Sequence, residues 1–216
     1  MGDFAAGLKS INDQFGVQLW GGDTVSIDGP AVFSATLIGE CPKGMTVTRR
    51  GAKPDHDIWL TGFLGKGYFG LRAITESREN SDIFYRPPPR LELQSLLRTF
   101  ASAAVDVSDG FIADLSHLLK ASAIGGNVEL ERLKFPKDIQ AWLVSEKGDL
   151  LTLLSHGDDY EVIFTSHADH RVAIEKAGKA LPFQIHRVGT CGLGNDLTLS
   201  FNGKEVPIGK AGYSHF

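Results

Sequence analysis

Three short segments of this 216-residue chain combine carboxylates with glycine, the residue types that hold a divalent cation beside a phosphate. They are Gly21–Thr24, Asp106–Gly110 and His156–Glu161. In the first segment, Gly22 lets the backbone approach a ligand closely and Asp23 supplies a hard oxygen ligand. An ordinary turn with a solvated Asp23 explains the same residues, because glycine and aspartate are common in turns.

The second segment places Asp106 and Asp109 three positions apart, at the expected start of a helix. Two carboxylates this close repel each other unless a cation lies between them. A helix N-terminus is also a favourable place for an anion. A phosphate bridged by Mg²⁺ to these carboxylates would use both facts. The alternative is that Ser108 or Asp109 only caps the helix while Asp106 is exposed.

The third segment, His156–Glu161, carries three acids within four positions and precedes an expected strand. It suggests contact with a cation or a substrate, and a charged loop is the alternative. The glycine-rich run Gly62–Gly67 resembles a P-loop only superficially. Two residues, instead of four, separate its first glycine from the Gly65-Lys66 pair, and Gly67 follows the lysine. We therefore expect a strand-to-helix turn there.

Hydrophobic periodicity and turn residues place these segments among alternating helices and strands. We expect helices over 4–15, 67–75, 91–104, 111–122 and 167–180. We expect strands over 17–20, 31–38, 58–61, 160–165 and 184–189, and a hairpin over 197–206 that turns at Asn202-Gly203. The pattern predicts an α/β (α+β) layer structure.

Composition excludes several classes of protein. Lys and Arg number 22 against 26 Asp and Glu, a formal charge of −4, so no broad basic field exists to hold a nucleic acid. No run approaches the roughly 20 apolar residues of a membrane span. Cys41 and Cys191 are far apart and show no metal-type spacing. We expect reduced thiols in a cytoplasmic protein that binds neither nucleic acid nor membrane.

Several motifs in a fixed order resemble the thiamine-monophosphate kinase family, and the resemblance covers essentially the whole chain. They are Trp20–Thr24, Arg49–Pro54, Leu60–Gly62 with Gly65 and Gly70-Leu71, Arg86-Pro87, Asp106–Gly110, Asp159–Glu161 and Gly212–Phe216. No single motif is decisive, but six or seven in order are specific. The chain departs from the family pattern at Lys66, where an acid is common, and at His156–Asp158, which replaces Gly-Gly-Glu.

The resemblance implies an ATP- and Mg²⁺-dependent transfer of phosphate to thiamine monophosphate, which gives thiamine diphosphate. It implies that Gly22, Asp23, Arg49 and Ser108 contact ATP, and that Asp23, Asp106 and Asp109 bind Mg²⁺. Asp106 and Asp109 would be the catalytic acids. Asp158 and Tyr213 would contact the thiamine substrate, and Tyr213 could stack on its flat cationic ring.

The resemblance also implies two domains. Residues 1–48 would be the remnant of an N-terminal ATP-binding domain, and residues 49–216 a C-terminal mixed-sheet domain with flanking helices. The family's early Gly-Asp-Asp acids and Asn-Leu-Ser-Asp-type helix have no counterpart in the chain, so it could be an inactive fragment. With that domain completed, a homodimer is expected. The alternatives are a non-catalytic thiamine-phosphate-binding module and another ATP-using enzyme of the same superfamily.

Overall fold

The computed structural model describes residues 2–76, 82–145 and 148–208, and the chain divides after Glu40 into two units. The first unit contains one helix, α1 (Gly2–Phe15), which ends as expected at Gly16 with a positive φ of 65°. The strands expected over 17–20 and 31–38 are absent from it. A strand is stable only when its backbone groups pair, and the described residues of this unit offer no neighbouring strand.

The second unit is built on one seven-stranded sheet in the order β2-β4-β1-β5-β3-β6-β7. All neighbouring pairs are antiparallel except β3–β6, which is parallel, so the predicted mixed sheet is confirmed. The strands are β1 (Asp57–Thr61), β2 (Ala103–Asp106), β3 (Gly125–Glu129), β4 (Val162–Ser166), β5 (Ile185–Gly192), β6 (Leu197–Phe201) and β7 (Lys204–Val206).

Helices surround this sheet. The α-helices are α2 (Lys66–Thr75), α3 (Asp82–Tyr85), α4 (Gln94–Phe100), α5 (Phe111–Ala121), α6 (Lys137–Val144), α7 (Leu150–Ser155) and α8 (Arg171–Gly178). Three short 3₁₀ turns are η1 (Leu91–Leu93), η2 (Leu130–Arg132) and η3 (Ala168–His170). The helices expected over 111–122 and 67–75 are confirmed as α5 and α2.

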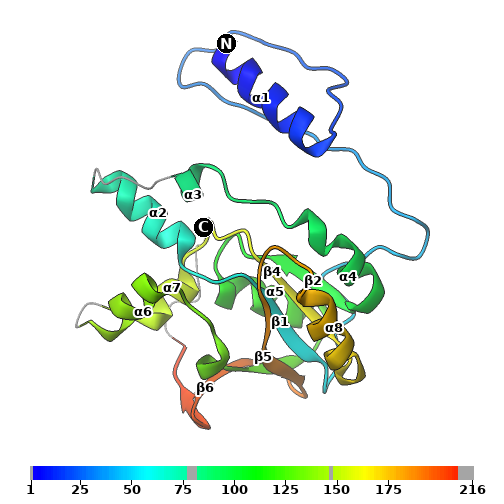
Figure 1. The fold of residues 1–216 in the computed structure, drawn as a ribbon, viewed down its shortest axis with the longest axis vertical. Coiled ribbons are helices and arrows are strands. Elements are labelled where there is room, and N and C mark those ends of the chain that lie inside the picture. The colour runs from blue at the N-terminus through cyan, green and yellow to red at the C-terminus, as the bar shows by residue number, and fades with distance from the viewer. Residues whose placement is uncertain (1, 77–81, 146–147, 209–216) are drawn as a thin grey trace. The chain divides into compact units, whose positions relative to one another are not determined.

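Alternating side chains of β1 give the sheet two different cores. Ile58 and Leu60 face α5, where they join a large apolar cluster that includes Phe111. Trp59 faces the other way and packs with Phe164 and with residues of α4 and α8. Figure 1 shows α5 on one side of the sheet and α4 and α8 on the other. All buried residues of both clusters lie at or beyond Ala52, so the second unit supplies its own core.

One predicted helix was wrong in extent. The helix expected over 91–104 is a 3₁₀ turn followed by α4, and the chain turns extended at Ala101 (ψ 135°) before entering β2. Ala103 and Ala104 carry no strong strand preference themselves, but they pair with Thr165 and Phe164 of β4. Pairing in the sheet therefore overrode the helical propensity of alanine.

The predicted hairpin is confirmed. β6 and β7 pair in antiparallel fashion with Leu199 opposite Val206, and the turn lies at Asn202-Gly203. Both turn residues have positive φ, 49° and 74°, as a two-residue hairpin turn of this kind requires.

Candidate functional site

Two loops cross at one end of the sheet and bring predicted site residues together. The first follows β2 and carries Ser108 and Asp109, and the second precedes β4 and carries Asp158. Tyr160 N donates to Val107 O at 2.9 Å, and Asp158 N donates to Ser108 O at 3.0 Å. These bonds continue the β2–β4 ladder beyond the strands and fix the two loops against each other.

Gly157 makes this crossing possible. A Cβ at this position would lie 2.0 Å from Ser108 O, far inside van der Waals contact, so no side chain fits between the loops. The residues that follow adopt left-handed backbone conformations, with φ 62° at Asp158 and φ 49° at Tyr160. Both conformations are uncommon for residues other than glycine. They persist only where the contacts of the surrounding structure hold the backbone in place.

Asp114 organises the first loop from the first turn of α5. Its Oδ2 accepts hydrogen bonds from Ser108 N, Asp109 N and Gly110 N at 2.9–3.2 Å. Burial raises the pKa of this carboxyl, and the three backbone N–H groups oppose that rise. The alternative in which Ser108 or Asp109 caps the helix is wrong, because Gly110 is the capping residue and makes no side-chain cap bond.

The predicted acid Asp158 contacts the Tyr160 phenol, and the charges of Asp106 and Asp109 also act on it. Tyr160 donates its hydroxyl hydrogen to Asp158 Oδ1 at 3.3 Å. Burial is the largest cause that raises the pKa of Tyr160, and the negative charges of Asp158, Asp106 and Asp109 raise it further. The structure thus places two sequence segments about 50 residues apart at one acidic centre.

Asp109 also has two metal-type neighbours that sequence reasoning missed. One ligand atom each of Asp109, Asp114 and His117 lie within 4.8 Å of one another. Asp114 and His117 are five and eight positions after Asp109, which is the spacing that a loop followed by a helix brings together. An acid in the first turn of the expected helix was the available signal. Oxygen donors of this kind suit a hard divalent cation such as Mg²⁺, whereas the imidazole does not.

The glycine-rich turn after β1 has a structural role, as expected. Gly65 N and Gly67 N at the start of α2 donate to the Asp159 carboxylate at 2.9–3.1 Å. A buried carboxylate thus occupies the position that a phosphate takes at many helix N-termini. Burial raises the pKa of Asp159 to about 6. Asp159 therefore positions the start of α2 against the Asp158 loop.

Glu161 anchors the same region from the sheet. Its carboxylate accepts hydrogen bonds from Thr61 Oγ1 at 2.6 Å and from Arg90, and it pairs with the Lys66 ammonium. Burial alone would raise the pKa of Glu161, but the bonds from Arg90 and Lys66 outweigh it and lower the pKa. The departure at Lys66 thus has a structural explanation, because the lysine is a buried partner of Glu161.

The remaining predicted site residues do not belong to the two crossing loops, and one of them lies outside the described residues. Gly22 and Asp23 belong to the first unit, where Asp23 Oδ1 accepts a hydrogen bond from Thr24 N at 2.8 Å. Arg49 is exposed, and its carbonyl accepts a bond from Ser122 Oγ. Ser122 follows the C-terminal end of α5, whereas the acidic loop precedes the N-terminal end of that helix. Tyr213 lies outside the described residues.

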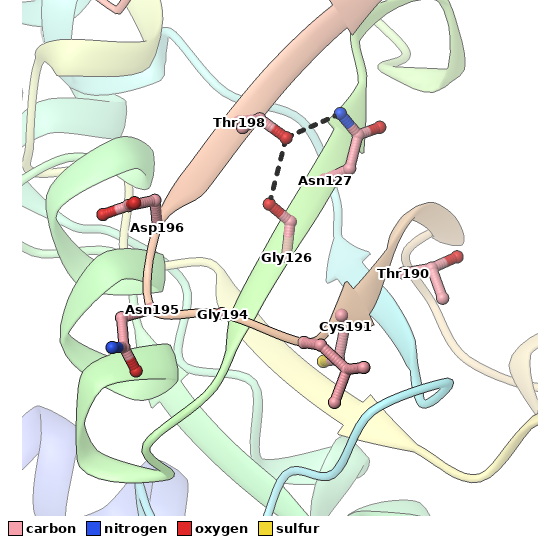
Figure 2. Close-up of a pocket in the computed structure, with 10 residues that line it drawn as sticks. Gly126, Asn127, Thr190, Cys191, Gly194, Asn195, Asp196 and Thr198 are labelled. Atoms are coloured by element: carbon pink, nitrogen blue, oxygen red, sulfur yellow. Dashed lines mark hydrogen bonds between the residues drawn. The ribbon is translucent and has the colours of Figure 1, made fainter.

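A cavity of about 430 Å³ lies at the other end of the strands. It is lined by the start of β3, the end of β5 and the loop that leads into β6, as Figure 2 shows. Some of its polar groups bond to one another: Asn127 Nδ2 donates to Thr198 Oγ1, which in turn donates to Gly126 O. Antiparallel register places this cavity opposite the acidic loops, so the two sites are separate.

The chain resembles known proteins in sequence over nearly its whole length. No protein-family model matches it. It is 36% identical over 220 residues to the thiamine-monophosphate kinase of Caulobacter vibrioides, which covers 98% of this chain and 62% of that protein. It is 34% identical over 225 residues to the thiamine-monophosphate kinase of Escherichia coli K12, which covers 99% of this chain and 68% of that protein. The chain thus spans roughly two thirds of these relatives.

Solved structures of thiamine-monophosphate kinases also resemble this chain in fold. The thiamine-monophosphate kinase of Stenotrophomonas maltophilia K279a matches with a TM-score of 0.66 and 30% identity, over 76% of this chain and 55% of that one. AaThiL complexed with AMPPCP and TMP shares the fold, with a TM-score of 0.62 at 24% identity over 79% of this chain and 54% of that one. The hydrogenase maturation protein HypE of Escherichia coli shares it at 13% identity, with a TM-score of 0.65 over 81% of this chain and 56% of that one. On the sequence identity and its coverage, this chain belongs to the thiamine-monophosphate kinase family.

Proposed function

We propose that this chain carries the acidic half of the active site for the ATP-dependent phosphorylation of thiamine monophosphate to thiamine diphosphate. The observation that carries the proposal is that backbone hydrogen bonds join the loop of Ser108 and Asp109 to the loop of Asp158, in a chain one third identical to thiamine-monophosphate kinases. A relative of the same fold, AaThiL, was solved with AMPPCP and TMP.

In this proposal Asp106 and Asp109 bind Mg²⁺, and Asp158 contacts the thiamine substrate. Mg²⁺ would neutralise the negative charge that spreads over the transferring phosphoryl group. The chain's own contribution is position: Asp114 holds the Asp109 loop through its backbone N–H groups, and Gly157 allows the Asp158 loop to lie against it. A direct in-line transfer needs no nucleophilic side chain.

The roles of five further residues stay part of the proposal. Ser108 and Gly22 would contact ATP, Asp23 would bind both ATP and Mg²⁺, Arg49 would contact the phosphates, and Tyr213 would contact the thiamine ring. We also propose that residues 1–48 are the remnant of an ATP-binding domain and 49–216 the second domain, although the described units divide after Glu40. A homodimer would follow once the first domain is complete.

The expected environment is the cytoplasm. Both cysteines are free, Cys41 exposed and Cys191 buried, and burial raises the pKa of the Cys191 thiol to about 12. Among the described residues, no helix is both long enough and apolar enough to span a bilayer.

The test is ADP formation by the chain with ATP, Mg²⁺ and thiamine monophosphate. We expect turnover that requires thiamine monophosphate and that Asp109→Asn reduces at least ~100-fold, because metal-held charge stabilisation is worth several kcal/mol. Asp169→Asn is the matched control, since its carboxylate is 85% exposed on η3. ATP turnover without any dependence on thiamine monophosphate would instead indicate another ATP-using enzyme of the superfamily.

A second function, a non-catalytic thiamine-phosphate-binding module, is favoured by one observation. No described residue of 2–40, which include Gly22 and Asp23, is buried, so that part of the chain lacks a core to hold an ATP site rigid. Calorimetric binding of thiamine monophosphate without ADP formation would establish this module. Absence of both binding and turnover would refute the site assignment itself.

A further inference from the structure

Two side chains of α5 lie beside Asp109 and are not among the proposed Mg²⁺ ligands. Asp114 belongs to the first turn of the helix, and His117 lies three positions later on the same face. One ligand atom of each of these side chains and one of Asp109 lie within 4.8 Å of one another. The start of α5 thus brings together two carboxylates and one imidazole, those of Asp109, Asp114 and His117, which we term the α5 cluster.

Asp114 is the member of the α5 cluster that the fold holds in one orientation. The residue is 1% exposed, and its Oδ2 accepts three backbone N–H groups of the preceding loop at 2.9–3.2 Å. Its other oxygen, Oδ1, has no hydrogen-bond partner in the described part of the chain. Burial is the largest cause that raises the pKa of Asp114, and the negative charge of Asp109 raises it further. Two carboxylates this close, one of them buried, favour a cation between them.

His117 determines which cation suits the α5 cluster. Its side chain is exposed and makes no hydrogen bond, ion pair or ring contact with the described residues, so its ring nitrogens are available. Imidazole is a good ligand for Zn²⁺ and related transition metals, whereas Mg²⁺ prefers oxygen. Ligand atoms around a tetrahedral Zn²⁺ lie about 3.4 Å apart, since each lies about 2.1 Å from the ion. Because His117 and Asp109 both reach solvent, small rotations of their side chains would close the cluster around an ion.

We infer that the α5 cluster is a binding site for Zn²⁺ or a transition-metal ion of similar ligand preference, separate from the Mg²⁺ position proposed at Asp106 and Asp109. Asp109 has two carboxylate oxygens and can offer one to each ion, and water would complete a four-coordinate shell around Zn²⁺. The site goes beyond the proposed function, because it needs neither ATP nor thiamine monophosphate. The competing explanation is that Asp114 only anchors the loop and that His117 is a surface residue without a ligand.

The experiment titrates Zn²⁺ into the full chain by isothermal titration calorimetry, in excess Mg²⁺ so that sites made only of oxygen ligands are filled. We expect wild type to bind Zn²⁺ and His117→Gln to bind it at least ~10-fold more weakly, because even the loss of a group that only supports a metal ligand costs about 10- to 100-fold. His156→Gln is the matched control and should retain wild-type affinity. His156 is also exposed, and its Nδ1 lies 2.8 Å from Thr152 O, so its Nε2 is equally available but lies outside the cluster.

Circular dichroism of each variant checks that it folds, so a lost affinity reports on the site. A wild-type chain that binds no Zn²⁺, or equal affinities in wild type and His117→Gln, would overturn the site and leave the proposed function standing. An equal loss in His117→Gln and His156→Gln would also overturn it, because scattered surface imidazoles would then hold the ion. A titration with Mg²⁺ alone separates the two positions. His117→Gln should keep the wild-type response to Mg²⁺, and a loss of Mg²⁺ affinity equal to that of Zn²⁺ would overturn a separate site.

Discussion

The two units of this chain contain similar apolar residues, which are exposed in the first unit and buried in the second. Trp20 in the first unit is 81% exposed. Trp59 of β1 in the second unit is 1% exposed, because it packs against β4, α4 and α8. The first unit buries none of its described residues, although Phe4 and Phe33 stack at 4.5 Å. The comparison shows that apolar side chains produce burial only when other elements are present to cover them.

The difference originates in strand pairing. In the second unit every strand finds a neighbour, and the paired sheet offers two faces on which helices bury their apolar sides. In the first unit, Val32, Leu37 and Ile38 belong to a segment with the pattern of a strand but form no strand and remain exposed. We infer that stability and the ordered candidate site both reside in the second unit.

The sharpest test of this comparison truncates one phenylalanine in each unit. Phe111→Ala, at a position with 0% exposure under the sheet, is expected to lower the free energy of unfolding by about 3–5 kcal/mol. Phe33→Ala, at a position 63% exposed, should change it by less than about 1 kcal/mol. Urea unfolding followed by circular dichroism measures both. Similar losses of unfolding free energy in the two variants would contradict the conclusion that stability resides in the second unit.

Removal of a buried charge in the second unit is expected to lower the free energy of unfolding by about 3 kcal/mol. Glu161→Gln leaves Lys66 and Arg90 without their shared anion in a buried site, and removal of one partner of such a pair is strongly destabilising. Lys9–Asp13 in α1 is the matched exposed pair, and Asp13→Asn should cost less than ~1 kcal/mol. Chemical denaturation of the two variants gives the difference directly, and equal costs would contradict it.

Two buried groups of the second unit predict opposite pH dependences of stability. Burial lowers the pKa of His186 from 6.5 to about 4, and neither of its ring nitrogens has a hydrogen-bond partner. The unfolded chain therefore takes up the proton first as the pH falls from 6.5 towards 4, and stability decreases. Asp159 has a raised pKa of about 6, so between pH 3.8 and 6 its contribution to stability decreases as the pH rises.

The two contributions oppose each other in the wild type and are separated by substitution. Relative to wild type, His186→Leu should make stability fall more steeply as the pH rises from 4 to 6, and Asp159→Asn should do the reverse. Each difference is at most roughly 3 kcal/mol, since one pKa unit corresponds to about 1.4 kcal/mol. Thermal unfolding at a series of pH values measures the slopes, and slopes equal to wild type in both variants would refute these burial effects.

The smallest effect is expected from removal of residues 1–40. Because all buried residues of both cores lie at or beyond Ala52, the remaining chain should unfold cooperatively with a stability within ~1 kcal/mol of the full chain. Calorimetry of the shortened chain measures this. Failure of the shortened chain to fold would show that the first unit contributes to stability after all.

Much of the second unit could be read from the sequence because its signals are local. Helical spacing predicted α2 and α5, and Asn202-Gly203 predicted the hairpin between β6 and β7. The acids Asp106, Asp109 and Asp158 could be singled out by type and spacing. Their roles rest on the family resemblance and stay a proposal.

Only the tertiary structure decided which of these residues meet. Asp109 and Asp158 converge because β2 and β4 are paired, and that pairing joins segments far apart along the chain. The same long-range pairing turned Ala103-Ala104 from expected helix into strand, and buried Asp114 and Asp159 as acceptors of backbone N–H groups. Local sequence fixes propensity and residue chemistry, whereas strand order and burial depend on contacts between distant segments, which no local pattern specifies.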